Sequence, residues 1–333
     1  MKLIAKLAGT AMLAGAMVAG AAMAQDKQSI TTVVKITGEG WFVRMEEGVK
    51  AFDAERENID AVQVGPAQAD AAQQARIIED LVAKGVSAIA VVPMDPSALE
   101  GVLRRAQGRG IKVIAHEGDS IVNADVDIEA FDNAAFGRKI NDGLAGCMGG
   151  EGKWTSFVGS LGSLTHVIWA DAGAESAAAN HPGMVLVAAK NESFNDANKA
   201  YEKAKEILRA YPDIKGFQGS SAIDVIGIGR AVEEAGLIGK VCVYGLGLPK
   251  DTGPYLESGA VNQIYFWDPK DAGFVMNVVA EKVLKGEEIT DGADLGVPGY
   301  NAVKVTKGPG NGIIIQGEAW VEVGKDGYKD YPF

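Results

Sequence analysis

The chain has 333 residues, 47% of them hydrophobic and 23% charged, a composition typical of a folded globular protein of about two domains. Its 44 acidic residues exceed its 32 Lys and Arg, and the net charge of −12 argues against binding to nucleic-acid phosphates or anionic lipid. Two cysteines exclude a disulfide scaffold and a four-thiolate metal site, and three histidines leave little room for a His-rich metal centre.

The first 24 residues have the pattern of a secretory signal peptide. Lys2 and Lys6 precede an apolar stretch over 7–18, and the small residues Ala22 and Ala24 form a cleavage pattern before Gln25. The alternative, a membrane anchor, is disfavoured because the apolar stretch is short and rich in Ala and Gly. We therefore expect a mature chain that is exported to the periplasm and carries 30 − 44 = −14 charges.

Strand and helix patterns alternate in the first half of the mature chain. Predicted strands cover 29–37, 61–65, 87–92 and 111–115, and predicted helices cover 41–55, 68–84 and 97–107. The pattern then starts again, with helices over 136–147, 165–181, 197–211 and 223–235 and strands over 153–158, 184–189, 214–218 and 241–246. A further short strand covers 262–266, and residues 311–323 alternate as a strand and turn that pack back on a lobe. Two such series predict an α/β protein with two similar lobes, each a doubly wound parallel sheet.

Motifs for catalysis or cofactor binding are missing from the predicted loops. Gly38-Glu39-Gly40 lacks the third glycine of a dinucleotide fingerprint, since position 43 is Val, and no Walker loop or Gly-x-Ser-x-Gly elbow is present. His116-Glu117 has no second His at metalloprotease spacing. We therefore predict no cofactor and no enzyme. Glu117 and Asp119 are open to three interpretations: a carboxylate pair for acid–base chemistry, ligand contacts, or a polar loop without a function in chemistry.

Polar and aromatic residues gather where the predicted strands end, the edge at which parallel sheets bind ligands. Carboxylates and Lys hydrogen-bond to hydroxyl groups, and aromatic rings cover C–H faces, so this mixture suits a neutral sugar or polyol. Lys35 interrupts an apolar strand, where a buried ammonium needs a partner. Trp41 and Phe42 either cover a ligand or pack on their own helix. His166 either contacts a ligand or caps a helix, and Trp169 lies either in the core or in the pocket.

Several segments carry a resemblance to a known family. They are 33–35 with 38–42, 112–119, the Tyr-Pro-Asp at 211–213, 254–259, and Trp267-Asp268. Over nearly all of the mature chain, the sequence resembles periplasmic sugar-binding proteins of ABC transporters of the ribose-binding type. Within them it is most similar to the autoinducer-2- and rhamnose-binding branch.

The resemblance implies a type I periplasmic binding protein, in which two lobes joined by three chain crossings close over one sugar. The expected first lobe comprises residues 25–130 and 267–298, and the second comprises 131–266 and 299–333. We expect hinge segments near 127–133, 265–268 and 296–301. The implied partners are a small-molecule sugar or polyol and a membrane permease, with no nucleic acid, and the protein is expected to be a monomer.

The resemblance also implies a set of ligand-binding residues. From the first lobe and the crossings these are Lys35, Glu39, Trp41, Phe42, Glu117, Asp119, Trp267 and Asp268. From the second lobe they are Thr165, His166, Ser220 and Ser221, and Trp169 is added as a candidate because it lies one turn after His166. The autoinducer-2 branch has Asp-Gln at 165–166, Pro and Ala near 220–221, and Asp at 117, so the departures here favour another monosaccharide or polyol. Autoinducer-2 and a periplasmic sugar-modifying enzyme remain the alternatives.

The two cysteines are not predicted to pair. Cys242 lies inside an apolar strand and Cys147 near a helix end, a placement that favours two buried free thiols, although an oxidising periplasm permits a disulfide.

Overall fold

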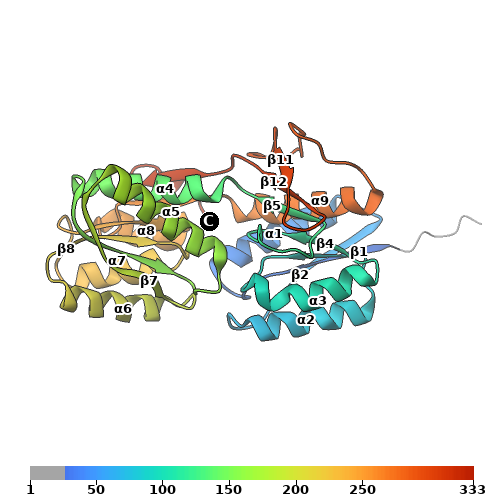
Figure 1. The fold of residues 1–333 in the computed structure, drawn as a ribbon, viewed down its shortest axis with the longest axis horizontal. Helices are drawn as coiled ribbons and strands as arrows, with labels where there is room; N and C mark the ends of the chain where they lie inside the picture. Colours follow the sequence, from blue (N-terminus) through green and yellow to red (C-terminus); the bar gives the residue numbers. More distant parts are fainter. Residues whose placement is uncertain (1–26) are drawn as a thin grey trace, which may run out of the picture.

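The computed structural model describes residues 27–333, which form two α/β lobes lying side by side (Figure 1). The predicted signal peptide, residues 1–24, lies outside the described residues. Within 27–333, no helix is both long and apolar enough to cross a bilayer. Each lobe has one mostly parallel sheet flanked by helices, so the predicted class with two doubly wound lobes is confirmed.

The first lobe is built on a seven-stranded sheet. In spatial order its strands are β11 (Lys304–Lys307), β12 (Ile313–Gln316), β5 (Val126–Glu129), β4 (Lys112–Ala115), β3 (Ala88–Val91), β1 (Gln28–Val33) and β2 (Ile59–Val64). All neighbouring strands are parallel except β11 and β12. Helices α2 (Ala71–Lys84) and α3 (Pro96–Gly108) pack against each other, and α1 (Gly40–Ala54) packs on α9 (Pro269–Lys285).

Alternating side chains of the buried strands fill the core on both faces of this sheet. Ile89 and Val91 of β3 pack with residues of α2 and α3, whereas Ala88 and Ala90 pack with residues of α1 and α9. This division follows from the two-residue period of a strand. It explains why these strands have continuous apolar sequences, as expected for a sheet covered on both faces.

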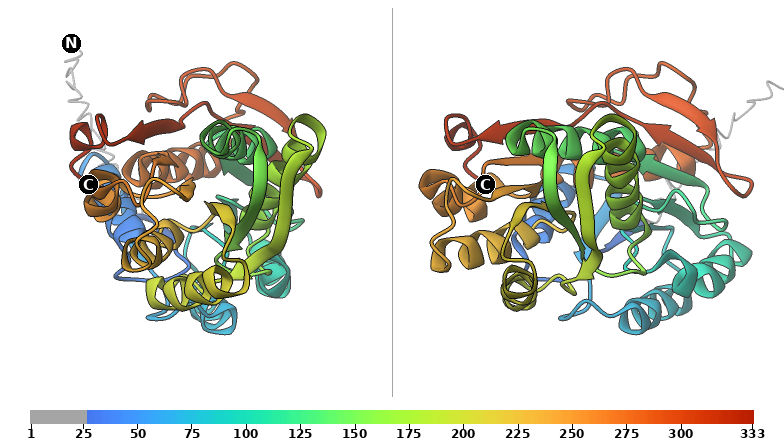
Figure 2. Two further views of the ribbon diagram at one scale, coloured as in Figure 1. Left: turned by 90° about the vertical axis from the view of Figure 1, so that its left-hand side faces the viewer. Right: turned by 60° about the vertical axis from the view of Figure 1, so that its left-hand side comes forward.

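The second lobe has a six-stranded sheet. In spatial order its strands are β13 (Val321–Gly324), β10 (Gln263–Phe266), β9 (Cys242–Leu246), β8 (Ile214–Gly219), β6 (Glu151–Val158) and β7 (Gly183–Glu192). Its helices are α4 (Asn133–Met148), α5 (Leu164–Asn180), α6 (Ala197–Ala210), α7 (Asp224–Glu234) and α8 (Pro249–Ser258), with a short 3-10 helix, η1 (Tyr328–Asp330). Figure 2 shows this lobe facing the viewer, with the chain end beside α8. Only β13 runs antiparallel to its neighbour.

The chain passes between the lobes three times: from β5 to α4, from β10 to α9, and from β12 to β13. The first crossing falls between Glu129 and Asn133, and the second falls between Phe266 and Pro269. The third crossing lies between Gln316 and Val321 and not in the segment 296–301, where it was expected. That segment contacts the crossing, since the Glu318 N–H donates to Gly299 O at 2.7 Å. Residues 304–316 were expected in the second lobe, but β12 pairs in parallel with β5, which places them in the first.

The cysteine prediction is wrong, because Cys147 and Cys242 form a disulfide. Helix α4 packs on β9, which brings the two Cα atoms to 6.1 Å although 95 residues separate them in the sequence. Strand and helix positions along the chain do not reveal which helix covers which strand, so the proximity was not visible in the sequence. Both ends of the bond lie within the second lobe.

Candidate functional site

A small cavity lies between the lobes at the carboxyl ends of their strands. It is lined by Lys35, Glu39, Trp41, Phe42, Glu117, His166, Asn195, Ser221, Ala222 and Leu246. Its volume of about 20 Å³ has room for about one water molecule. The first five of these residues come from the first lobe and the last five from the second, so the site exists only where the lobes meet.

A buried ion pair forms the first-lobe side of the cavity. The Lys35 ammonium, just beyond β1, donates to a carboxylate oxygen of Glu117, just beyond β4. Each side chain is only 5% exposed. Burial alone would raise the pKa of Glu117, but the positive charge of Lys35 holds it below its ordinary value. The partner that a buried Lys35 requires is therefore Glu117.

The start of α1 and the residue before it supply an aromatic wall and a second carboxyl group. Glu39 immediately precedes the helix, and burial raises its pKa to about 7 against the opposing charge of Lys35. Trp41 and Phe42 are each about 5% exposed and line the cavity. The Trp41 ring also meets Trp267 edge to face at 4.5 Å between centroids. A position that could cover a ligand and a position packed on the core are therefore compatible for Trp41 and Phe42, because the two rings do both: they pack on the core and line the cavity.

His166 contributes a hydrogen-bond donor from the first turn of α5. Its Nδ1 accepts from the Gly159 N–H at 3.1 Å, which leaves the proton of the neutral ring on Nε2. Burial, assisted by Lys35, lowers the pKa of His166 to about 3, so the ring is neutral at physiological pH. A side chain at Gly159 would lie 2.9 Å from that Nδ1, so glycine is required for this contact.

The remaining polar lining comes from two neighbouring loops of the second lobe. The Ser221 hydroxyl, after β8, donates to Asn195 Oδ1 at 2.8 Å, which leaves the serine oxygen free to accept a further hydrogen bond. Asn195, after β7, was not predicted as a site residue, and neither were Ala222 and Leu246. Strand β7 runs to Glu192, three residues beyond the predicted end, so the correct strand end would have placed Asn195 in an exit loop.

Three hydrogen bonds cross the cleft beside the cavity, and the longest is donated by Asn195 Nδ2 to Met94 Sδ at 3.8 Å. The Thr165 hydroxyl of α5 donates to the backbone oxygen of Glu117 at 3.0 Å. The Ser163 hydroxyl, at the start of the same helix, donates to Met94 O at 3.3 Å. Each bond joins one lobe to the other, so the lobes are in contact. Thr165, predicted to contact ligand, lies at this lobe–lobe contact and not among the cavity-lining residues.

Other predicted site residues lie outside the cavity. The Asp268 carboxylate caps α9 and accepts from Arg44 at 2.9 and 2.7 Å. Trp267 and Trp169 are at most 1% exposed and pack in the aromatic core, where Trp169 Nε1 donates to Asn133 Oδ1 at 2.8 Å. Position relative to a strand end did not reveal that these side chains point into the core.

Two further predicted residues also lie beside the site without lining it. Ser220 is fully buried, and its N–H donates to Asp224 at 3.1 Å. Asp119 is half-buried near Asn133, and burial raises the pKa of its carboxyl group. The predicted pair Glu117 and Asp119 is therefore divided, since Glu117 alone faces Lys35 and the cavity.

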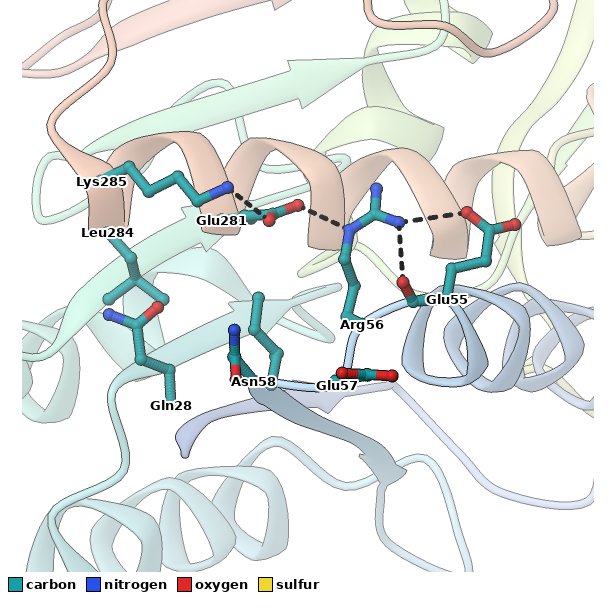
Figure 3. Close-up of a pocket in the computed structure, with 9 residues that line it drawn as sticks. Gln28, Glu55, Arg56, Glu57, Asn58, Glu281, Leu284 and Lys285 are labelled. Carbon is teal, nitrogen blue, oxygen red and sulfur yellow. Dashed lines mark hydrogen bonds and ion pairs between the residues drawn. The ribbon is translucent and has the colours of Figure 1, made fainter. Parts of the chain in front are cut away.

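A larger cavity, of about 460 Å³, lies at the opposite end of the first lobe (Figure 3). It adjoins Gln28 and Ile59, the first residues of β1 and β2, and so lies at the amino ends of the strands. Its central Arg56 is paired with Glu281 at 2.9 Å, and Glu281 is also bound by Lys285 at 2.6 Å. Because Arg56, Glu281 and Lys285 already satisfy one another and ligands bind at the other end of such sheets, the cleft between the lobes is the better candidate.

Comparisons with known proteins agree with this architecture. The sequence profile described as "periplasmic binding protein domain" matches residues 30–288. The chain is 27% identical to the D-allose-binding periplasmic protein of Escherichia coli, over 78% of this chain and 85% of that protein. It is 26% identical to the D-ribose/D-allose-binding protein of Pseudomonas aeruginosa, over 71% of this chain and 76% of that protein.

Solved structures share the fold over almost the whole chain. An ABC transporter solute-binding protein from Clostridium phytofermentas with bound L-rhamnose superposes with a TM-score of 0.83 at 22% identity, covering 92% of this chain and 98% of that one. LsrB from Clostridium saccharobutylicum in complex with AI-2 has a TM-score of 0.82 at 20% identity, covering 92% and 100%. The matched profile covers well over half of the sequence, and the chain belongs to the periplasmic binding protein family.

Proposed function

We propose that this protein is the periplasmic solute-binding component of an ABC importer and that it binds a neutral monosaccharide or sugar-like polyol by closure of its two lobes. The observation that carries the proposal is the cavity of donors, acceptors and rings shared between the lobes. The relatives named for ribose and allose and the fold neighbour with bound rhamnose support the same ligand class. The mature chain acts as a monomer and delivers its sugar to a membrane permease.

The polar groups of the cavity match hydroxyl groups in both directions. Lys35 and His166 Nε2 donate, whereas Glu117 and the Ser221 oxygen accept. A hydroxyl group can donate and accept at once, so a polyol satisfies such a mixed set. Trp41, Phe42 and Leu246 supply apolar surface for the C–H faces of a sugar ring.

The charge balance favours an uncharged ligand. Lys35 and Glu117 neutralise each other, and Glu39, with a pKa of about 7, is only partly ionised at neutral pH. An anionic ligand would meet one or two carboxylates for a single ammonium, and a cationic ligand would compete with Lys35 for Glu117. Burying an uncompensated charge in such a cleft is costly, whereas burying a hydrogen-bonded hydroxyl is not.

A thermal-shift screen of the mature chain tests the proposal, with pentoses, deoxyhexoses, branched sugars, polyols and autoinducer-2 as separate arms. A ligand present at 100 times its Kd stabilises the folded state by about 2.7 kcal/mol, enough for a clear shift of Tm. Hits are confirmed by calorimetry, and the sugar is recovered after long incubation. Unaltered sugar supports binding, chemical conversion supports the enzyme alternative, and a screen without any hit contradicts the proposal.

A further inference from the structure

The backbone at Glu117 adopts a left-handed conformation, with φ of +56°. A residue other than glycine rarely occupies this region, and surrounding contacts must hold it there. The strained residue is the one whose carboxylate pairs with Lys35 in the cavity and whose carbonyl oxygen accepts from Thr165. Whatever fixes the backbone here therefore fixes both contacts.

The next residue is held by two carboxylates at once. The Gly118 N–H donates to Asp127 Oδ1 and to Glu129 Oε1, each at 3.1 Å. Asp127 and Glu129 stand two residues apart on β5, so their side chains lie on the same face of the strand. They are 3% and 2% exposed, which makes this a deeply buried arrangement.

Within residues 27–333, neither carboxylate forms an ion pair with a Lys, Arg or His. Asp127 Oδ2 is buried without a hydrogen-bond partner in that part of the chain. The titratable groups that face the pair are His116, Glu117 and Asp119 from the β4–β5 loop and Tyr300 from the segment before β11. Helix α4 adds the uncharged Asn133, and β12 places Gln316 opposite Glu129.

Two ionised carboxylates at this place would repel each other in a medium of low polarity. Burial first, and then each other's charge, raises the pKa of Glu129 well above its ordinary value, and burial likewise raises the pKa of Asp127. A proton on Glu129, donated to Asp127, removes the repulsion and leaves one oxygen of each residue to accept from Gly118. His116 does not supply the missing positive charge, since burial lowers its pKa.

We infer that Asp127 and Glu129 are positioning residues for the ligand site, which share one proton and hold Gly118 so that Glu117 keeps the backbone conformation that aims its carboxylate at Lys35. The inference rests on the proposed function, because the site it supports is the sugar site. It adds a pH dependence that arises outside the cavity lining. Loss of the shared proton separates the two carboxylates, releases Gly118 and weakens ligand binding.

The direction follows from the raised pKa values. The pair binds more protons when folded than when unfolded, so its stabilising effect is complete at acidic pH and is lost as the pH rises through the folded-state pKa. Loss of the same proton releases Gly118, and a weakening on the scale of one hydrogen bond should lower sugar affinity by roughly threefold to tenfold between pH 6 and 8.5. Glu129→Gln mimics the protonated acid, since its amide donates to Asp127 and its oxygen accepts from Gly118. This variant should keep the affinity that the wild type has at pH 6, with a change of less than about twofold across the range.

The experiment is calorimetric titration of the best sugar from the screen at pH 6, 7, 8 and 8.5 into wild type, Glu129→Gln and Glu129→Leu. Leucine cannot bind Gly118, so Glu129→Leu should lose affinity at every pH while Gln restores it. Glu100→Gln is the matched control, because Glu100 also accepts from two backbone N–H groups of the same lobe, Val122 and Asn123, but is only partly buried. It should keep the wild-type pH profile.

Glu39 is the competing source of a pH effect, since it lines the cavity and its pKa is about 7. The same titrations in Glu39→Gln separate the two. A profile that stays steep in Glu39→Gln and flattens in Glu129→Gln supports the inference, and the opposite result overturns it. Tm without sugar, measured over the same pH range, should fall less in Glu129→Gln than in the wild type. That comparison tests the shared proton even if no sugar binds, a result that would contradict the proposed function alone.

Discussion

Replacing Lys35 by Met removes the only cation that contacts the buried Glu117 carboxylate within residues 27–333. Because both side chains are 5% exposed, water cannot replace the lost ammonium, and the remaining carboxylate is left buried without compensation. Breaking a buried ion pair in this way costs about 3–5 kcal/mol of the free energy of unfolding. Adding Glu117→Gln to Lys35→Met should restore about 2 kcal/mol of that loss, since the uncompensated charge then disappears.

Urea unfolding of the two single variants and the double variant measures this coupling. Lys27→Met is the control, because Lys27 forms a similar pair with Asp60 at 2.8 Å on the surface and its removal should change stability very little. Stability depends on pH in a defined direction: the folded pKa of Glu117 is lowered, so the contribution of the pair is present at neutral pH and is lost as the pH falls through that pKa. The difference between wild type and Lys35→Met should thus shrink below about pH 4.

The same variant tests the site. Loss of one charge-assisted hydrogen bond to a sugar hydroxyl, worth about 1.5–3 kcal/mol, should raise the Kd by roughly 10- to 150-fold in calorimetry. A stability loss below about 1 kcal/mol, equal to that of Lys27→Met, would refute the description of Lys35 and Glu117 as a desolvated pair. If Lys35→Met shows the expected loss of stability but its affinity for the sugar is unchanged, only the role of Lys35 in ligand binding is refuted.

Three further predictions address other contacts. Cys147→Ser with Cys242→Ser should lower the free energy of unfolding by about 4–5 kcal/mol, as expected for a closed loop of 95 residues, without changing the Kd; a loss below about 1 kcal/mol would contradict it. Thr165→Val should raise the Kd about fivefold by removing one bond of about 1 kcal/mol between the lobes, and an unchanged Kd would show that this bond does not favour closure. His166→Ala should weaken binding about tenfold by removing one donor, equally at pH 5.5 and pH 8 because the ring is neutral at both; a loss confined to one pH would show that the ring titrates in this range.

Much of the fold could be predicted because each local signal agreed with the packing that followed. Apolar stretches such as 87–92 became central strands, and Asp70 and Gly85 delimit α2 as its cap residues. Strand β5 was not predicted, since its four residues include two carboxylates, Asp127 and Glu129, and an acidic sequence does not have the pattern of a buried strand. Asp127 and Glu129, whose charges hid the strand from sequence-based prediction, are the residues that accept from the Gly118 N–H.

The strand-end rule selected much of the cavity lining but could not determine side-chain direction. It selected Trp41, Glu117 and His166, which line the cavity, and it selected Trp267 and Asp268 equally, which do not. Trp267 turns into the aromatic core, and Asp268 turns towards Arg44 of a helix more than 200 residues away in the sequence. Such choices depend on long-range partners, which a pattern of neighbouring residues does not contain.

Glu117 lies both at the cavity and at the contact between the lobes. Its carboxylate faces Lys35 and the cavity in the first lobe, while its carbonyl oxygen accepts the bond from Thr165 of the second. With about 20 Å³ between the closed lobes, against roughly 300 Å³ or more for common small-molecule sites, a sugar can enter only when the lobes separate. The bonds from Thr165 and Ser163 are worth about 1 kcal/mol each, too little to lock the cleft, so contacts made by the ligand can decide whether it closes. Because one strained residue carries both kinds of contact, we expect a shift of its backbone to weaken ligand binding and closure together.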